Sequence, residues 1–356
     1  GRLRPHRSLG ADHPQGAGGP HVSVRVGIIG AGVMGADHAR LLSGAVSGAT
    51  VAAVCDVDRA RAGIVAQASG AARVVTDPLA LIGDPGVDAV LIASSDATHE
   101  QYVVASLAAG RPVLCEKPLA PTVQGCRRIL DAEQAAGARL VSVGFMRRYD
   151  PGYAALKRTL DAGRIGAPLM LHCVHRNPVA PAGLPSAAVI TNSAVHELDI
   201  SRWLLGEEIT EVTVHTPRSA TAAGSTRDPQ LLVLRSQSGV VIDVEVFINA
   251  GYGYDVRCEL VGEAGTVTLD AAPATLLRSD GAATTALPAD WRPRFAEAYR
   301  IELQDWVDGL QAGGEPRGAS AWDGYAATAV AEACVRALAT GRPEPVTLDR
   351  RPKLYA

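Results

Sequence analysis

Val24-Arg25-Val26-Gly27-Ile28-Ile29-Gly30-Ala31-Gly32-Val33-Met34-Gly35 is the stretch of sequence that decides the fold. From Val24 to Ile29 it is apolar and rich in β-branched residues, with Arg25 as the one charge, which is typical of a buried parallel strand. Three glycines with the spacing Gly-x-Gly-x-x-Gly follow directly, and the residues from Ala36 to Leu42 have the pattern of a helix. This succession predicts the first strand, turn and helix of a doubly wound α/β domain.

The three glycines have separate roles in a turn of this kind. Gly30 permits the tight turn from strand to helix, Gly32 lets the backbone approach a pyrophosphate, and Gly35 allows the helix to pack closely on the strand. The free N–H groups of the first helical turn, which contains Val33 and Met34, then bind the diphosphate together with the helix dipole. The stretch therefore predicts a dinucleotide site, the alternative being a plain glycine-rich turn in a chain with 37 glycines.

A second apolar run, Thr50 to Cys55, ends at Asp56. Asp56 follows the last glycine at the spacing of about 20 residues that dinucleotide folds require. We expect its carboxylate to accept hydrogen bonds from the adenosine ribose hydroxyls and to repel a 2′-phosphate, which favours NAD over NADP. Arg59 and Arg61 come next and leave the NADP alternative open, because an arginine can also bind a phosphate. Otherwise they are solvated helix residues.

Length and composition indicate a globular protein of two domains, with 356 residues of which 47% are hydrophobic. A net charge of −3 gives no reason to expect a nucleic-acid or membrane partner, and no apolar run approaches the length of a bilayer span. The six cysteines form no Cys-x-x-Cys pair, so we expect reduced, buried thiols in a cytoplasmic protein. Residues 1–21 are rich in Gly, Pro, Arg and His and are expected to form a disordered extension.

Strands and helices alternate over residues 22–143. We predict strands at 73–75, 87–93, 112–115 and 139–143, and helices at 59–69 (capped by Asp58), from 76, at 98–109 and at 122–136. Because parallel strands are connected through helical crossovers, this alternation predicts a Rossmann domain with a doubly wound parallel sheet that binds NAD.

Over residues 144–356 the pattern changes to strands without intervening helices. Predicted strands lie at 169–175, 211–215, 231–235, 240–248, 256–261 and 266–269, with a hairpin at Gly262-Glu263-Ala264-Gly265. Predicted helices lie at 153–162, 194–205, 295–310 and 321–340. The sequence therefore predicts an α+β domain with a large, mainly antiparallel sheet, used for substrate binding and oligomerisation.

Ligands of a doubly wound sheet bind at the carboxyl ends of its strands. Two such ends carry polar side chains besides the glycine turn: Ser94-Ser95-Asp96-Ala97-Thr98-His99 and Glu116-Lys117-Pro118. Pro118 keeps Lys117 out of a helix and at the strand end. There its ammonium can donate to a substrate hydroxyl and stabilise a developing alkoxide, and burial beside a cationic ring lowers the pKa of such a lysine. The alternative is a surface lysine paired with Glu116.

Asn192, His196 and Asp199 are spaced four and three residues apart, which places them on one face of a helix. A histidine supported by Asp199 one turn away can act as a general base near neutral pH, although a helical histidine is often only structural. His175, His196 and Asp199 form a conceivable metal site, but no second signal supports a metal, and His172 faces the opposite side of its strand from His175. We therefore predict no metal.

At these residues the chain resembles the glucose–fructose oxidoreductase/inositol dehydrogenase/rhizopine-catabolism (Gfo/Idh/MocA) family, from about Val24 to the C-terminus. The Gly30–Gly35 turn and Glu116-Lys117-Pro118 are shared across that family. Further motifs of the family are Gly144-Phe145-Met146-Arg147-Arg148-Tyr149-Asp150, His172-Cys173-Val174-His175-Arg176-Asn177-Pro178, His196-Glu197-Leu198-Asp199, Tyr252-Gly253-Tyr254-Asp255 and Ala321-Trp322-Asp323-Gly324-Tyr325. Of these, the stretches Phe145–Asp150 and His175–Pro178 are narrower and point to its inositol group.

The resemblance implies NAD-dependent oxidation of a secondary alcohol of myo-inositol, or a close cyclitol, to an inosose. It implies that Lys117 and His196 handle the hydroxyl proton, and that a homotetramer forms. It implies a set of polar substrate contacts, as expected for a ring of hydroxyls: Lys117, Arg147, His175, Asn177, Asn192, Ser193, His196, Asp199 and Tyr254. It also assigns cofactor contacts to Gly30, Gly32, Val33, Met34, Gly35, Asp56, Ser94, Ser95, His99, Glu116 and Lys117.

Asn192 departs from the resemblance, because the inositol enzymes carry an aspartate four residues before the catalytic histidine. An amide can donate and accept hydrogen bonds but cannot take a proton or carry charge. Either His196 suffices alone, or the substrate is turned or different, or activity is low. If the departure is a handicap, Asn192→Asp raises turnover on myo-inositol.

Three other functions remain open at this point. A dehydrogenase of a pyranose or an amino-cyclitol precursor needs the same fold and cofactor. A glycoside hydrolase that uses bound NAD transiently forms no net NADH. A catalytically silent NAD sensor has Asn192 as its only support.

Overall fold

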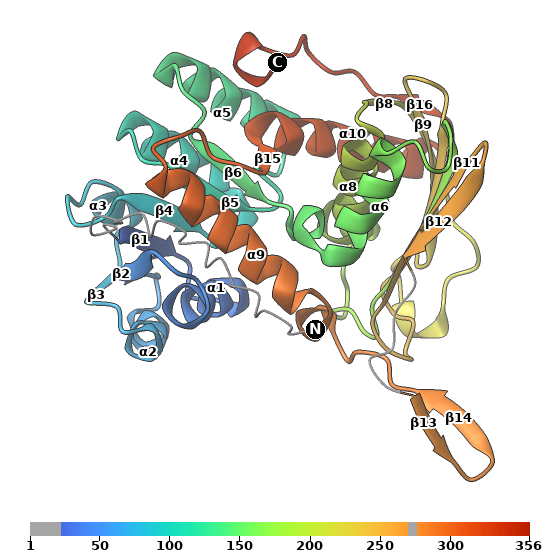
Figure 1. Cartoon of the computed structure of the whole chain (residues 1–356), viewed down its shortest axis with the longest axis horizontal. Helices are drawn as coiled ribbons and strands as arrows, with labels where there is room; N and C mark the ends of the chain where they lie inside the picture. The colour runs from blue at the N-terminus through green and yellow to red at the C-terminus, as the bar shows by residue number, and fades with distance from the viewer. Residues whose placement is uncertain (1–22, 270–275) are drawn as a thin grey trace, which may run out of the picture.

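The computed structural model describes residues 23–269 and 276–356, so the predicted extension at residues 1–21 lies outside the described part. Figure 1 shows two sheets at opposite sides of the molecule with helices between and around them. The first sheet has seven strands in the order β15-β6-β5-β4-β1-β2-β3. Its strands are β1 (Val24–Ile29), β2 (Ala49–Cys55), β3 (Arg73–Val75), β4 (Ala89–Ile92), β5 (Val113–Glu116), β6 (Val141–Gly144) and β15 (Ala319–Ser320).

The strand order reverses between β1 and β4, which are parallel neighbours. Every pair in this sheet is parallel except β15 against β6. In an open sheet of this kind the crevice for a ligand lies at the reversal, outside the carboxyl ends of the strands. The predicted doubly wound Rossmann sheet is therefore confirmed, and the single antiparallel strand β15 is an addition that two residues of sequence did not reveal.

The helices of this half begin and end at the predicted signals. They are α1 (Val33–Gly44), α2 (Arg59–Ser69), α3 (Pro78–Ile82), α4 (Asp96–Ala108) and α5 (Val123–Ala136). The Asp58 side chain accepts from the Ala60 and Arg61 N–H groups, so it caps α2 as predicted. Gly137 ends α5 in a left-handed conformation.

The two faces of the first sheet bury separate apolar clusters. Val26, Ile28 and Leu91 belong to one cluster together with residues of α1 and of the late helix α9 (Trp291–Gln311). Ile29, Val90 and Ile92 belong to the other, with residues of α4 and α5. Because both faces are covered, these strands are apolar on both sides, which explains their unbroken hydrophobic runs.

The second sheet has the order β12-β11-β7-β10-β9-β8-β16 and is antiparallel except for the pair β7 and β10. Its strands are β7 (Pro168–Arg176), β8 (Ile209–His215), β9 (Gln230–Ser236), β10 (Val241–Phe247), β11 (Asp255–Gly262), β12 (Gly265–Leu269) and β16 (Glu344–Pro345). The predicted mainly antiparallel sheet and its 262–265 hairpin are confirmed. A separate hairpin of β13 (Leu276–Ser279) and β14 (Ala282–Thr285) projects from the body (Figure 1).

Helices α6 (Pro151–Asp161), α8 (Val195–Leu205) and α10 (Ala321–Thr340) lie on one side of this sheet (Figure 1). Shorter helical segments are η1 (Met146–Tyr149), α7 (Ser186–Ala188), η2 (Val189–Ala194), η3 (Thr221–Ala223) and η4 (Lys353–Tyr355). The segment η2 is a π-helix that runs directly into α8. In the described residues, no helix has both the length and the apolar character needed to cross a membrane.

The chain crosses back to the first sheet near its C-terminus. Strand β15 pairs with β6, α9 packs against α1, and α10 packs against α5. The Gln304 amide of α9 donates to the Ser47 carbonyl at 3.1 Å, and its oxygen accepts from the Ser47 N–H at 2.8 Å. The division at residue 143 therefore stays a prediction, because residues far beyond it complete the first half.

Candidate active site

The glycine turn between β1 and α1 is shaped by close backbone contacts. Gly30 has a φ of +100°, and a Cβ on it would lie 2.4 Å from the Ala93 carbonyl oxygen. A Cβ on Gly35 would lie 1.8 Å from the Gly30 carbonyl oxygen, whereas a Cβ on Gly32 would meet nothing within 4 Å. Gly30 and Gly35 thus fix the turn, and the space over Gly32 at the start of α1 fits a diphosphate.

A cavity of about 390 Å³ adjoins this turn. It is lined by the ends of β1, β2 and β4 and by residues that follow them: Ile29, Gly30, Gly32, Cys55, Asp56, Val57, Arg61, Pro78, Ala93, Ser94, Ser95, Thr98 and Tyr102. Five predicted cofactor residues, Gly30, Gly32, Asp56, Ser94 and Ser95, therefore lie on one cavity. Val33 and Gly35 both belong to the first turn of α1. Val33 is exposed, whereas Gly35 is buried against the Gly30 carbonyl.

His99 was predicted to contact the cofactor, but it does not face this cavity. Its ring is buried, with Nδ1 2.7 Å from the Pro118 carbonyl oxygen and Nε2 3.2 Å from that of Ser94. It joins the two strand-end loops that carry Ser94 and Lys117. His99 is thus placed to hold the walls of the site from behind.

Asp56 is held in place by main-chain donors. Its carboxylate accepts from the Ala31 N–H at 2.7 Å and from the Asp58 N–H at 2.9 Å, and Arg61 donates to both of its oxygens. Although burial alone raises the pKa of Asp56, the bonds to Arg61 and to the main chain lower the pKa below its usual value. A fixed, ionised carboxylate at the end of β2 fits a ribose diol. Arg61 lines the cavity; Arg59 does not.

The Asp56–Arg61 pair predicts how cofactor choice can be changed. Asp56→Ser should improve kcat/KM for NADP relative to NAD by about tenfold or more, because it removes the repulsion and frees Arg61 for a phosphate. Initial rates with both cofactors measure this ratio. Adding Arg61→Leu should cancel the gain, whereas adding Arg59→Leu should not. An unchanged ratio in Asp56→Ser would contradict the assigned role of Asp56.

A second cavity of about 240 Å³ lies between the two sheets. It is lined by Met34 of α1, by Glu116 and Lys117 at the end of β5, and by residues of the second half: Met146, His175, Asn177, Asn192, Ser193, His196, Tyr254, Trp291 and Tyr299. Lys117 and His196 therefore face one cavity, as does each predicted substrate residue except Arg147 and Asp199. Met34 and Glu116, predicted cofactor residues, line it as well.

Lys117 reaches across the cavity to the π-helix η2. Its Nζ donates to the Asn192 main-chain carbonyl at 3.1 Å. Burial lowers the pKa of Lys117, the charge of Arg147 adds to this effect, and Glu116 and Asp96 oppose it. The Glu116 carboxylate already has another partner, because its Oε1 lies 2.7 Å from His38 Nε2. The alternative of a surface lysine paired with Glu116 is therefore wrong.

His196 lies at the start of α8 and is only 8% exposed. Burial lowers the pKa of His196 well below its usual value, and the positive charges of Lys117 and Arg147 lower it further. Its buried Nδ1 has no hydrogen-bond partner among the described residues. The ring is therefore neutral and keeps a lone pair that can accept a hydrogen bond.

Asp199 does not support His196, which corrects the predicted pair. Its two carboxylate oxygens accept from Arg148 at 2.9 and 2.5 Å, and it is buried away from both cavities. His196 and Asp199 both belong to the regular helix α8, but the fork-shaped guanidinium of Arg148 is the stronger partner for a carboxylate. Asn192 lies in the preceding π-helix, so the regular spacing that was predicted does not apply to it.

Like His99 and Asp199, Arg147 is a predicted site residue that does not face a cavity, since it lies behind the wall of the second cavity. It donates to Glu197, and its Nη2 lies 3.2 Å from His175 Nδ1. Charged groups so deeply buried require partners, and Glu197 is the partner.

Sequence reasoning missed Glu197, His38, Trp291 and Tyr299. Glu197 lies within the motif His196-Glu197-Leu198-Asp199, which by itself indicates no role for this residue. A signal for it was available, because Arg147 and Arg148 interrupt an apolar stretch and two buried arginines require two buried carboxylates. Glu197 and Asp199 meet that requirement. No signal of comparable strength marks the other three.

In the described part of the chain, no group of three or more His, Cys, Asp or Glu side chains is placed to hold a metal ion. His172 pairs with Asp243, on the opposite face of β7 from His175. All described cysteines are buried, and none of them forms a disulfide.

Glu302 of α9 lies beneath this site without a hydrogen-bond partner for either carboxylate oxygen in the described residues. Burial raises the pKa of Glu302 well above its usual value, the charges of Glu116 and Asp199 add to this, and Arg148 opposes it. The folded protein then retains a proton that the unfolded chain releases, so this residue costs stability as the pH rises above about 4.5.

Glu302→Gln removes this titration and should change the pH dependence of stability. Relative to the unsubstituted protein, the variant should gain up to about 1.4 kcal/mol of unfolding free energy for each pH unit until the pH reaches the pKa of the folded protein. Urea unfolding at pH 5, 6.5 and 8 measures the difference. Glu297→Gln, at an exposed position of the same helix, is the control. A difference that is constant across this range would show that Glu302 is ionised in the folded protein.

Comparison with known protein families covers both halves of the chain. Residues 24–145 match the model described as "Oxidoreductase family, NAD-binding Rossmann fold", and residues 157–348 match "Oxidoreductase family, C-terminal alpha/beta domain".

Individual relatives match over almost their whole length. Inositol 2-dehydrogenase 2 and inositol 2-dehydrogenase 1 of Saccharopolyspora erythraea are 55% and 56% identical to this chain, over 94% of it and 99% of each relative. Among solved structures, the myo-inositol dehydrogenase of Lactobacillus casei in complex with NAD(H) and myo-inositol superposes with a TM-score of 0.91. It is 37% identical, over 94% of this chain and 100% of that one.

Proposed function

The chain belongs to the Gfo/Idh/MocA oxidoreductase family with an NAD-binding Rossmann fold, and on that premise we propose that it oxidises a secondary alcohol of myo-inositol, or a close cyclitol, to an inosose. The enzyme is an NAD-dependent oxidoreductase. The observation that carries the substrate is the cavity between the sheets, where a lysine, two histidines and two asparagines converge. A site built to hydrogen-bond many hydroxyls discriminates strongly against analogues that lack them.

Each cavity residue has a role in this proposal. NAD, held at the Gly30–Gly35 turn and Asp56, would supply the acceptor for the hydride of the carbinol carbon. Lys117 donates from Nζ to the reacting oxygen and stabilises its developing negative charge. His196, neutral beside it, accepts the hydroxyl proton. His175, Asn177, Ser193 and Tyr254 orient the remaining hydroxyls, and Asn192 presents its amide to the same cavity.

NADH formation tests this function directly. We expect an increase in absorbance at 340 nm with NAD and myo-inositol, and an inosose whose oxidised carbon is identified by NMR. Stereoisomers of inositol, a pyranose and an amino-cyclitol form the comparison panel. Oxidation of only the pyranose or the amino-cyclitol would show that the substrate is not an inositol but belongs to that other class. Absence of NADH with every alcohol would favour the hydrolase or the sensor, and would overturn the proposal.

We further propose that the chain forms a homotetramer in the cytoplasm. Met170 alternates along β7 with the buried Leu171 and Cys173, so it lies exposed on the sheet face opposite α6, α8 and α10. Exposed apolar surface of this kind is usual at subunit contacts. Reduced cysteines are typical of a cytoplasmic protein. Light scattering after size-exclusion chromatography measures the assembly, and a monomer of about 37 kDa would contradict it.

A further inference from the structure

Accepting a proton places His196 in an unfavourable state. The imidazolium would lie among the positive charges of Lys117 and Arg147, and its buried Nδ1 has no acceptor among the described residues. Glu116 is the one carboxylate among the described residues that line the cavity, and it already accepts from His38 and from the Lys117 main chain. A base that receives a proton therefore needs another carboxylate to stabilise the charge.

His175 has such a carboxylate. Its Nδ1 lies 2.9 Å from Glu197 Oε2, and both side chains are buried. The pKa of Glu197 lies below its usual value, because Arg147 and His175 outweigh the effect of burial, so the carboxylate carries no hydrogen. In the neutral tautomer whose Nδ1 donates to this carboxylate, Nε2 keeps a lone pair, and Arg147 Nη2, 3.2 Å from the same Nδ1, makes no hydrogen bond to it.

The position of His175 relative to His196 suits a proton transfer through one intervening group. The two rings both line the cavity, and their centroids are 6.4 Å apart. Tyr254 packs edge-on against His175 at 5.9 Å and fixes its orientation. No direct hydrogen bond joins the two histidines in the described residues, so a hydroxyl of a bound polyol or a water molecule has to bridge them.

We propose that the proton released on oxidation passes from His196 to His175, where Glu197 stabilises the resulting imidazolium. This inference rests on the proposed function and names the group that holds the proton. The balance is complete: the carbinol carbon loses a hydride to NAD, the oxygen loses its proton to His196, and the carbon–oxygen double bond forms. His196 then returns to the neutral state by giving a proton to the bridging group, which gives one to His175 Nε2.

Glu197 is a positioning and charge-stabilising residue in this scheme. Arg147 neutralises part of its charge from behind and holds it against His175. The groups that face His175 are thus Glu197 and His196 of α8, Arg147 of η1 and Tyr254 before β11, with Lys117 across the cavity. His196 lies on α8 and His175 on β7. Of the two, His175 is the one with a carboxylate partner, so we assign the stored proton to it.

His175→Asn tests the relay without disturbing the buried Arg147–Glu197 pair. We expect kcat to fall about 10²-fold, with a smaller change in KM and with NADH affinity unchanged. Stopped-flow measurement with a pH indicator should show slower proton release than in the unsubstituted enzyme. His172→Asn, on the opposite face of the same strand, is the matched control and should retain its kcat.

Glu197→Gln should lower kcat and move the acidic limb of its pH profile to lower pH, because a neutral amide stabilises the imidazolium less. Glu197→Asp should restore part of the activity. In the Glu197→Gln protein, adding Asn192→Asp should also restore turnover, since residue 192 lines the same cavity and then supplies a carboxylate. Melting temperatures and NADH affinities show which variants are folded. If Glu197→Gln does not fold, His175→Asn alone tests the relay.

Two outcomes would overturn the relay. A rise in KM for His175→Asn with unchanged kcat and unchanged pH profile would show that His175 only binds substrate. An unchanged rate of proton release would show that the proton leaves by another route. Either result leaves the proposed function intact, because that function fails only if inositols yield no NADH or if Lys117 and His196 are dispensable.

Discussion

Replacing Lys117 by alanine should lower kcat by about 10³-fold while NAD still binds. The amine is the donor nearest to the reacting oxygen in the proposed complex, and its effect is exerted on a charge that exists only during the reaction. The cofactor contacts predicted at the glycine turn and at Asp56 line the other cavity. Substrate turnover and cofactor affinity should therefore separate in this variant.

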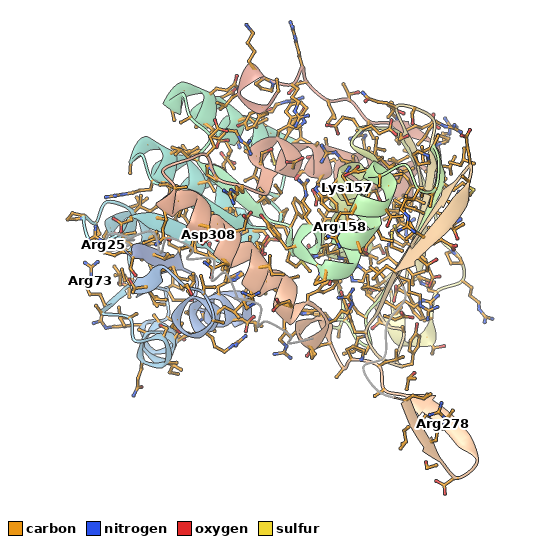
Figure 2. All side chains as sticks on the ribbon, in the orientation of Figure 1. Arg25, Arg73, Lys157, Arg158, Arg278 and Asp308 are labelled. Carbon is orange, nitrogen blue, oxygen red and sulfur yellow. The ribbon has the colours of Figure 1, made fainter. Side chains whose placement is uncertain are left out.

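The comparison requires a second lysine variant. Lys157→Ala is suitable, because Lys157 lies on α6 (Figure 2) and pairs with Asp161 at 2.7 Å, away from both cavities. NADH fluorescence titration measures binding, and absorbance at 340 nm measures turnover. A Lys117→Ala enzyme with a kcat within tenfold of the original would remove the lysine from the mechanism. Lost NADH binding would instead show that Lys117 holds the cofactor.

Gly35→Ala should destabilise the protein by about 3 kcal/mol or more and abolish NAD binding. The added Cβ would lie 1.8 Å from the Gly30 carbonyl oxygen, which is main chain. Gly30 cannot move away, because it is itself held close to the Ala93 main chain. The first turn of α1 would have to detach from β1. Thermal unfolding and NADH titration measure the two effects.

Two other glycines separate the contributions of packing and of ligand approach. Gly32→Ala has room in the free protein, so its melting temperature should stay unchanged while NAD affinity falls. Gly63→Ala, in the interior of α2, should stabilise the protein by about 0.5–1 kcal/mol. If Gly35→Ala melts at the original temperature, the packing role of this glycine is wrong.

Most of the fold was predictable because its signals are local. The strand and helix of the glycine turn, the Asp58 cap and the 262–265 hairpin each depend on neighbouring residues, and the structure confirms them. The strand β15 was not predictable, because two residues carry no periodicity. The π-helix η2 was missed for a related reason, since its six residues read as a helix start of ordinary pitch.

The site was predictable where residues follow the strands of the first sheet, because the topology brings those strand ends together. Lys117, Asp56 and Ser94 illustrate this. The partners of buried charges were not predictable, because they depend on elements far apart in the chain. Asp199 was expected beside His196 but pairs with Arg148, some fifty residues earlier. Glu197 forms contacts with His175 and an ion pair with Arg147.

The return of the chain to β6 through β15 determines how the protein can be dissected. A fragment that stops at residue 143 would leave the backbone edge of β6 unpaired and the outer surfaces of α1 and α5 bare of α9 and α10. Such a fragment invites edge-to-edge association with other copies. The nucleotide-binding half is therefore obtained in isolation only if residues 291–340 are supplied with it, either fused or as a separate peptide.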